Sequence, residues 1–305
     1  MVAVLEGKSV VVTGSGRGIG AAIAASAAEH GARVVVNDID DAPVSATVAA
    51  IVGAGGDAIG CVADVSQWSE AERLIEECVS AFGRIDGLVN NAAVFGMNRL
   101  DEMSEAELRT ALSVNVAGTA FCATHAVRRM LAQGSGSIVN VTSGAQAGIP
   151  TMGVYGATKG AVASFTYAWA AELAGTGVRC NALSPMARTR MVDITDSYLA
   201  AQGLLMPHGP SPDPETNAPV VVHLLSDASA GLNGQVVRIE GTHLSTMTHP
   251  AVWLPTIERD PWTVDAVRAA FDDELGDRLS PIGVVGMIPD IDLQGSAFWS
   301  ANADE

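Results

Sequence analysis

The chain has 305 residues, 48% of them hydrophobic, so it can bury a large core and is unlike an intrinsically disordered protein. Its formal net charge of −17 argues against a nucleic-acid partner, because phosphate backbones bind Lys- and Arg-rich surfaces. No apolar run reaches the roughly 20 residues that span a bilayer, and the N-terminus lacks the pattern of a signal peptide. We therefore expect a cytoplasmic protein with no membrane contact.

The cysteines and histidines give no sign of a metal site. Cys61, Cys78, Cys122 and Cys180 are widely spaced without a CxxC pair, and the six histidines form neither HxxxH nor HExxH. We expect buried free thiols and no bound metal.

Along the chain, short Val- and Ile-rich runs alternate with longer Ala-rich runs of helical periodicity. The predicted strands are Ser9–Thr13, Arg33–Asn37, Asp57–Val62, Gly87–Asn90, Ser137–Thr142, Val178–Ser184 and Val236–Ile239. The predicted helices are Gly18–His30, Val44–Gly53, Trp68–Phe82, Glu105–Ala132, Gly153–Ala174 and Ala218–Ser226. This alternation predicts an α/β fold, a Rossmann-type doubly wound parallel sheet of about seven strands with helices on both faces.

Two regions depart from the alternation. Residues 186–217 are rich in Pro, Gly and Ser and are interpreted as a mobile substrate loop within a catalytic domain of residues 1–244. Residues 245–305 form a C-terminal extension with a predicted helix at Thr263–Leu275 and tryptophans at 253, 262 and 299. The extension either covers the active site of its own or a neighbouring subunit, or it packs in the core and at interfaces.

Gly14, Gly18 and Gly20 lie between the first strand and the first helix. Glycine allows a tight turn that approaches a pyrophosphate, and the helix start offers free N–H groups to the anion. Asp38 follows about 20 residues later at the end of the second strand, where a carboxylate can accept hydrogen bonds from a ribose diol and repel a 2′-phosphate. NAD is therefore favoured over NADP, with a structural turn aspartate as the alternative.

Tyr155 and Lys159 lie four residues apart in a predicted helix and therefore on one face. The chain has only three tyrosines and two lysines, so their proximity indicates a specific need. An ammonium group beside a phenol favours the phenolate, and we expect it to lower the tyrosine pKa toward neutrality.

These features together resemble the short-chain dehydrogenase/reductase family over about residues 5–240. The family motifs occur in order: TGxxxGxG at Thr13–Gly20, an acidic residue at Asp38, ADV at Ala63–Val65, NNA at Asn90–Ala92, VN at Val114–Asn115, TS at Thr142–Ser143, YxxxK at Tyr155–Lys159 and NALSP at Asn181–Pro185. One departure is Met186, which stands where the family commonly has Gly after the proline, so that Thr189 lies one residue early.

The resemblance implies a catalytic set of Tyr155 as acid/base, Lys159 at the nicotinamide ribose, Ser143 at the substrate oxygen and Asn115 in a proton relay. Ser143 as a strand end and Asn115 as a helix cap or kink are the structural alternatives. The cofactor residues that it implies are Gly14, Ser15, Arg17, Gly18, Ile19, Gly20, Asp38, Asp64, Val65, Asn91, Ala92, Tyr155, Lys159, Pro185 and Thr189. The implied substrate contacts are Gln146, Met186 and Arg188.

We therefore predict an NAD-dependent enzyme that interconverts a secondary alcohol and a ketone. The C-terminal part resembles the branch of (3R)-hydroxyacyl-CoA and hydroxysteroid dehydrogenases, although Asn115 stands where that branch often has histidine. This resemblance implies a bulky hydroxyacyl thioester or hydroxysteroid-like substrate, and the aromatic and Met residues suit an apolar one. A smaller cyclic or aromatic alcohol is the first alternative, and a non-catalytic NAD-binding sensor or scaffold is the second. The family resemblance also implies a homodimer or homotetramer.

Overall fold

The computed structural model describes residues 3–201, 211–252 and 254–279. Part of the predicted substrate loop (202–210, including Met206), Trp253 and the tail from residue 280 with Trp299 lie outside the described residues. The chain divides into two compact units, residues 1–247 and 248–305, each of which is described by itself.

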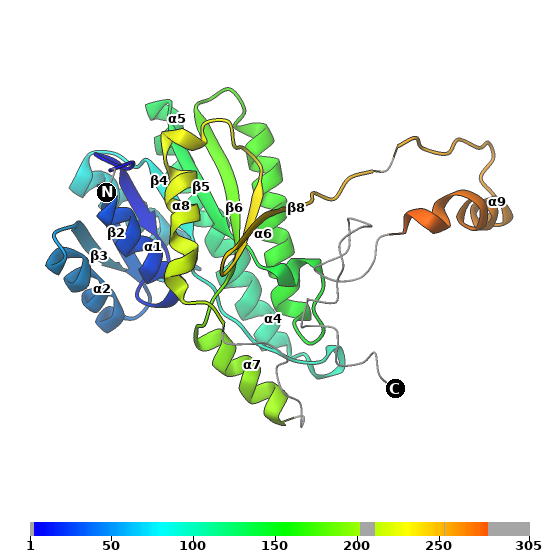
Figure 1. Cartoon of the computed structure of the whole chain (residues 1–305), viewed down its shortest axis with the longest axis horizontal. Coiled ribbons are helices and arrows are strands. Elements are labelled where there is room, and N and C mark those ends of the chain that lie inside the picture. The colour runs from blue at the N-terminus through cyan, green and yellow to red at the C-terminus, as the bar shows by residue number, and fades with distance from the viewer. Residues whose placement is uncertain (1–2, 202–210, 253, 280–305) are drawn as a thin grey trace. The chain divides into compact units, whose positions relative to one another are not determined.

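The first unit is built around one sheet with strand order β3-β2-β1-β4-β5-β6-β7-β8 (Figure 1). The strands are β1 (Ser9–Val12), β2 (Arg33–Asp38), β3 (Asp57–Val62), β4 (Gly87–Asn90), β5 (Gly136–Val141), β6 (Val178–Met186), β7 (Val236–Glu240) and β8 (His243–Met247). All neighbouring pairs from β3 to β7 are parallel, which confirms the predicted doubly wound fold.

The sequence did not predict β8, which pairs antiparallel with β7. Its residues, HLSTM, are mostly exposed and therefore lack the Val- and Ile-rich run that marks the buried strands. The turn between the two strands contains Gly241 with φ +57°, a conformation that glycine adopts without steric cost.

Alternate residues of β1 face two separate apolar cores, one on each side of the sheet. Val10 and Val12 pack with residues of α1 and α8 on one side, whereas Val11 packs with residues of α3 and α5 on the other. This double burial explains the continuous apolar strands. The four cysteines are buried free thiols, as expected.

The helices of the first unit are α1 (Gly18–Glu29), α2 (Asp41–Gly53), α3 (Trp68–Phe82), α4 (Glu105–Ala111), α5 (Thr119–Gln133), α6 (Gly153–Glu172), α7 (Arg190–Ala201) and α8 (Ala218–Leu225). Short 3-10 helices lie at Leu100–Glu102, Gly144–Ala147, Pro214–Asn217 and Asp227–Ser229. No helix among the described residues is long and apolar enough to cross a membrane.

Two predictions about the helices need correction. The predicted single helix Glu105–Ala132 is interrupted by a π-helical turn, Leu112–Gly118, whose Asn115 carbonyl accepts a hydrogen bond from Thr119 Oγ1 at 2.8 Å. The segment 186–217 is not simply a loop, because its first residue ends β6 and α7 covers Arg190–Ala201. The Pro-rich composition belongs to residues 207–214 and obscured the helix before them.

In the second unit, α9 (Val264–Ala270) begins at Thr263, whose hydroxyl accepts a hydrogen bond from Ala266 N at 3.1 Å. A π-helical turn (Phe271–Leu275) and a 3-10 helix (Gly276–Arg278) follow, so the helix predicted at Thr263–Leu275 is confirmed in position. Arg259 pairs with Glu274 at 2.7 Å and lies 5.8 Å from the ring centre of Trp262, which remains 47% exposed.

Candidate active site

The glycine loop lies at the carboxyl ends of β1 and β4, where the strand order changes direction and open α/β sheets place their ligands. Gly14 has φ +60°, and a Cβ on it would lie 2.7 Å from Ala92 Cα. The segment after β4 holds the loop from the other side, because Asn91 Nδ2 donates to the carbonyls of Thr13 and Gly14 at 2.9 Å. A side chain in place of Gly14 would therefore have no space.

The start of α1 is suited to an anion. The helix begins at Gly18, whose φ is +57°, and no side chain among the described residues caps it. Its first turn contains no acidic residue, so the free N–H groups and the positive end of the helix dipole meet no competing charge. The loop and this helix start fit the pyrophosphate of a dinucleotide.

Asp38 ends β2 beside the same loop. Its Oδ2 accepts a hydrogen bond from Gly16 N at 3.2 Å, which places the carboxylate where a ribose beyond the pyrophosphate would lie. The structure adds a neighbouring ion pair that the sequence did not indicate: Arg17 Nη2 lies 2.7 Å from Asp40 Oδ2. Arg17, the arginine of this loop, is therefore paired with a second carboxylate.

Three further predicted cofactor residues, Thr189, Val65 and Ser15, lie near the glycine loop or the π-helical turn. Thr189 lies against the loop, since a Cβ on Gly18 would be 3.6 Å from Thr189 Cγ2, and Val65 contacts the π-helical turn at Gly118. Ser15 is fully buried, and both its N–H and its hydroxyl are bonded within the protein. Its side chain is thus a support for the loop rather than an exposed binding group.

Asp64, Ile19 and Pro185 also lie at this edge of the sheet. Asp64 Oδ1 accepts a hydrogen bond from Ser66 N at 2.9 Å, so the carboxylate shapes the turn before α3. Ile19 is partly buried and packs against the apolar core that includes residues of α1. Pro185 is the second-last residue of β6, directly before Met186.

The predicted catalytic residues meet at the carboxyl end of β5. Ser143 lies two residues after the end of β5, and its hydroxyl is hydrogen-bonded to the phenol of Tyr155 on α6. The close approach depends on Gly156, because a Cβ at that position would lie 2.5 Å from the Ala145 carbonyl oxygen. Lys159 Nζ donates to the Val141 carbonyl at 2.7 Å and lies 5.6 Å from the ring centre of Tyr155.

The pKa of Tyr155 departs from the value that the sequence predicts. Burial raises the pKa of Tyr155 to about 12, against a smaller lowering effect of the hydrogen bond with Ser143. Burial also lowers the pKa of Lys159 to about 8. The expected lowering of the tyrosine pKa is therefore not observed in this structure, in which desolvation of the phenolate dominates and Lys159 is not among the groups that shift the pKa.

Asn115 occupies the π-helical turn and is 1% exposed. Its side chain accepts from Val94 N at 2.8 Å and donates to Val94 O and Thr158 Oγ1, both at 3.0 Å. Thr158 Oγ1 in turn donates to the Tyr155 carbonyl at 2.7 Å. Asn115 thus connects the segment after β4 to the helix that carries Tyr155, and its side-chain groups are engaged within the protein.

An apolar wall surrounds the tyrosine, and its members were not predicted from the sequence. The Phe95 ring stands edge-on to Tyr155 with ring centres 4.9 Å apart, and Met97, Ile149 and Met152 belong to the same cluster. The signal for Phe95 and Met97 was available, because both follow the Asn91 motif at the carboxyl end of β4.

The three predicted substrate residues are placed differently. Gln146 lies in the 3-10 helix after Ser143, and its Nε2 donates weakly to Met247 Sδ at 3.5 Å. Met186 ends β6, and its carbonyl accepts from Asn217 Nδ2 at 3.1 Å. Arg188 is exposed, with its backbone N–H bonded to the Pro212 carbonyl at 2.7 Å.

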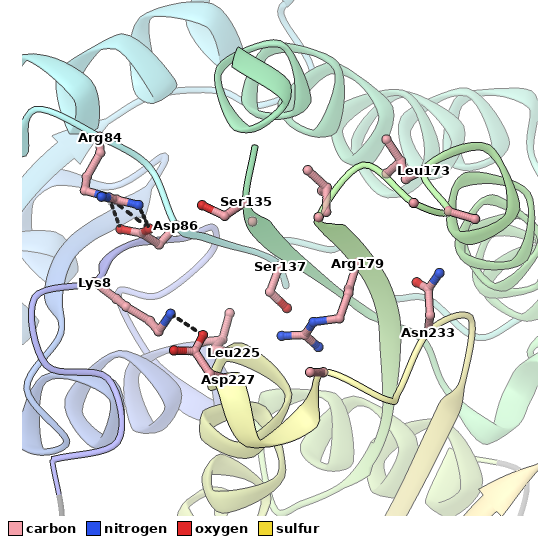
Figure 2. A pocket seen from close by; sticks show the side chains of 16 residues that line it. Lys8, Arg84, Asp86, Ser135, Ser137, Leu173, Arg179, Leu225, Asp227 and Asn233 are labelled. Carbon is pink, nitrogen blue, oxygen red and sulfur yellow. Dashed lines mark hydrogen bonds and ion pairs between the residues drawn. The ribbon is translucent and has the colours of Figure 1, made fainter. Parts of the chain in front are cut away.

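A cavity of about 700 Å³ lies at the opposite edge of the sheet (Figure 2). Its lining includes residues at the amino ends of β1, β4, β5 and β6, away from Ser143 and Tyr155. Its charges are internally matched: Lys8 pairs with Asp227 at 2.7 Å, and Arg84 pairs with Asp86 at 2.6 Å. Arg179 donates to carbonyls at the end of α8. The cavity therefore contains none of the predicted site residues.

No group of three or more His, Cys, Asp or Glu side chains within residues 3–201, 211–252 and 254–279 is arranged to hold a metal ion.

Comparison with known proteins places this fold and site in a family. The sequence profile of the family described as enoyl-(acyl carrier protein) reductase matches residues 14–241. An uncharacterized oxidoreductase of Methylorubrum extorquens is 42% identical over 245 residues, 78% of this chain and 98% of that protein. The 2,5-dichloro-2,5-cyclohexadiene-1,4-diol dehydrogenase of Sphingobium indicum is 36% identical over 249 residues, 78% of this chain and 97% of that protein.

Solved structures agree with these relatives. A short-chain dehydrogenase from Mycobacterium avium has a TM-score of 0.81 at 31% identity, covering 93% of this chain and 100% of that chain. A gluconate 5-dehydrogenase from Burkholderia cenocepacia, in complex with NADP and tartrate, has a TM-score of 0.70 at 32% identity, covering 78% and 95%. The chain belongs to the short-chain dehydrogenase/reductase family and is an oxidoreductase of the Rossmann type.

Replacing Gly14 with Ala should both destabilise the protein and weaken dinucleotide binding, because the new methyl group would overlap Ala92 and the residue would keep a positive φ. We expect a loss of about 2 kcal/mol or more in the free energy of unfolding, measured by urea denaturation. Gly53→Ala is the matched control, since nothing lies within 4 Å of its Cβ position and it should be neutral or slightly stabilising. Equal effects of the two substitutions would contradict the packing argument.

Lys159→Met should stabilise the protein at pH 7. Below about pH 8 both the folded and the unfolded chain carry the charged lysine, so the full cost of burying it is present. As pH rises from about 8 toward the ordinary value of 10.5, the folded chain loses the proton first and the wild type gains stability relative to the variant.

The expected advantage of Lys159→Met at pH 7 is on the order of 1–3 kcal/mol, or roughly 2–8 °C in Tm, and it should shrink by pH 9.5. Thermal unfolding of both proteins at the two pH values measures it. Because Tyr155 is present in both proteins, its titration contributes equally to both and cancels in the difference between their stabilities. A variant that is less stable than the wild type at pH 7 would show that burial of the ammonium is not a net cost.

Proposed function

We propose that this protein is an NAD-dependent dehydrogenase that interconverts a secondary alcohol and a ketone, with Tyr155 as the acid/base. The observation that carries the proposal is the convergence of Ser143, Tyr155 and Lys159 at the carboxyl end of β5, beside the glycine loop. A non-catalytic sensor would not need to bury a lysine and a tyrosine at unfavourable cost beside the loop.

The roles follow from the contacts. A bound nicotinamide would supply the acceptor for the hydride that leaves the carbinol carbon of the alcohol. Tyr155 takes the hydroxyl proton in oxidation and returns it to the carbonyl oxygen in reduction. Ser143, which is hydrogen-bonded to the phenol, holds the substrate oxygen beside it. The Lys159 ammonium, which is fixed by the Val141 carbonyl, would bind the ribose hydroxyls beside the nicotinamide.

For Asn115 the geometry favours a positioning role. Its side chain holds Val94 and Thr158, and through Thr158 it fixes the first turns of α6 on which Tyr155 lies. A proton relay at this residue would have to use its backbone carbonyl, which already accepts one hydrogen bond from Thr119.

NAD is the proposed cofactor because the carboxylate of Asp38 lies beside Gly16 and the guanidinium of Arg17, in the same loop, is paired with Asp40. A 2′-phosphate would meet the Asp38 charge without a free cation beside it. The gluconate 5-dehydrogenase relative binds NADP, so the two cofactors need to be compared directly in this protein.

For the substrate, the apolar wall of Phe95, Met97, Ile149 and Met152 supports a cyclic or aromatic secondary alcohol. The diol dehydrogenase relative acts on a ring alcohol of this kind. A hydroxyacyl thioester or hydroxysteroid is the second candidate, supported by exposed Arg188 and Arg190 at the start of α7, which could contact a phosphorylated carrier. A turnover panel of cyclic alcohols, hydroxysteroids and hydroxyacyl-CoAs with NAD separates the two.

Tyr155→Phe should lower kcat by roughly 10²–10⁴-fold while leaving NADH binding within a few-fold of the wild type, because only the proton-transfer group is lost. NADH formation measures turnover, and NADH fluorescence measures binding. Tyr167→Phe, about three turns further along α6, is the matched control and should retain activity. Near-normal turnover by Tyr155→Phe would overturn the mechanism.

The wild type should use NAD about 100-fold or more efficiently than NADP, since like charges in contact near a protein surface repel by several kcal/mol. Asp38→Ala should narrow this ratio of kcat/KM values, mainly by improving the value for NADP. Asp57→Ala, an exposed aspartate at the amino end of β3, serves as the control. If the wild type uses both cofactors equally well, the role assigned to Asp38 is wrong.

A further inference from the structure

Gln146 is fixed close to the reacting group by its backbone. It lies in the 3-10 helix Gly144–Ala147, three residues after Ser143, and its N–H donates to the Ser143 carbonyl at 3.1 Å. Its side chain crosses to β8, where Nε2 donates to Met247 Sδ at 3.5 Å. Thioether sulfur is a weak acceptor, so the contact orients the amide without satisfying it strongly.

The other end of this amide has no partner. Gln146 Oε1 is buried and accepts no hydrogen bond from any described residue. A buried acceptor without a donor is costly, and such groups need a physical reason when they occur in native proteins. Met247 supplies no donor, and the neighbouring cluster of Phe95, Met97, Ile149 and Met152 presents only apolar side chains.

Several other polar side chains near the candidate site, unlike Gln146 Oε1, have hydrogen-bond partners. The side chain of Asn115 is bonded at both ends, Thr158 donates to the Tyr155 carbonyl, and Thr142 donates to Leu183 O at 3.0 Å. Of the buried side-chain atoms without partners, only Gln146 Oε1 belongs to the segment that carries Ser143. Asn90 Oδ1 at the end of β4 and Asn217 Oδ1 beside the end of β6 are also buried without a partner among the described residues, but Gln146 Oε1 is the one within a few residues of Ser143.

We propose that Gln146 is a specificity-determining residue and that the substrate carries a second hydroxyl group, which donates to Gln146 Oε1. The preferred substrate class is thus a cyclic diol or a hydroxylated cyclic ketone rather than a simple cyclic alcohol. This inference rests on the proposed function. In the oxidation, one hydroxyl-bearing carbon gives its hydride to NAD and its hydroxyl proton to Tyr155, while the second hydroxyl is bound and chemically unchanged.

A site that is built to hydrogen-bond a substrate hydroxyl rejects the analogue that lacks it, because the buried polar group is then left unpaired. A mono-alcohol leaves Gln146 Oε1 without a hydrogen-bond donor, as in the protein alone, whereas a diol supplies one. The benefit should therefore appear as a preference in kcat/KM for the diol over its deoxy analogue, and it should depend on the amide of Gln146.

The test compares cyclohexanol with cyclohexane-1,2-, 1,3- and 1,4-diol, as separate cis and trans isomers, using NAD and the wild type or Gln146→Leu. The wild type should prefer at least one diol over cyclohexanol by about tenfold or more in kcat/KM. Gln146→Leu should lose this preference while its kcat/KM for cyclohexanol stays within about threefold of the wild type. Because the substitution removes a buried unpaired acceptor, the variant should also unfold at a temperature no lower than that of the wild type.

Each alternative outcome contradicts the inference in a different way. A wild type that uses cyclohexanol as well as every diol would show that no second hydroxyl is recognised. Equal losses on cyclohexanol and diol in Gln146→Leu, with a lowered unfolding temperature, would show that the glutamine is structural. Failure of the proposed function gives a distinct result, namely no NADH formation with any alcohol of this set or of the wider panel.

Discussion

The burial of one ammonium group organises the active site. Lys159 Nζ lies inside the protein and donates to the carbonyl of Val141, the last residue of β5, at 2.7 Å. For this bond to form, α6 must approach the end of β5 closely, and Gly156 permits that approach because it presents no Cβ to the Ala145 carbonyl. The same approach brings Tyr155 to Ser143, so the geometry of the proposed catalytic residues and the burial of the lysine have one cause.

A second set of contacts fixes α6 from the opposite side. The π-helical turn between α4 and α5 turns Asn115 inward, where it binds the backbone of Val94 and the hydroxyl of Thr158. A regular helix from Glu105 to Gln133 would place this residue differently, since π-helical turns shift the register of side chains and often mark functional sites. The interruption of the helix therefore has the same consequence as Gly156: it determines where Tyr155 lies.

The sequence predicted well what depends on periodicity and on contiguous motifs. The parallel strands, α1, α3 and the glycine loop came directly from apolar runs and glycine spacing, because buried strands and helix starts have strong local signals. The antiparallel β8 and α7 were missed, since neither has an apolar run and one adjoins a Pro-rich segment.

The contacts within the site were likewise only partly predictable from the sequence. Adjacency in sequence predicted that Tyr155 and Lys159 share a helix face. It could not predict the pKa of either group, because desolvation depends on the apolar residues Phe95, Ile149 and Met152, which come from two loops far apart in the chain. Likewise, the pairing of Arg17 with Asp40 joins residues on different elements and appears only once the fold is formed.

The charged groups that line the cavity at the amino edge are bonded within the protein, whereas two groups beside the candidate site have no such partner among the described residues. At the amino edge, Lys8 and Arg84 pair with carboxylates, and Arg179 caps the carbonyls at the end of α8 (Figure 2). At the carboxyl edge, α1 begins without a side-chain cap and Gln146 Oε1 lacks a donor. Unpaired groups beside the candidate site are expected where binding groups must stay available, although Arg33 Nε at the amino end of β2 is also buried without a partner among the described residues. These unpaired groups, rather than the size of any cavity, favour the carboxyl edge as the candidate site.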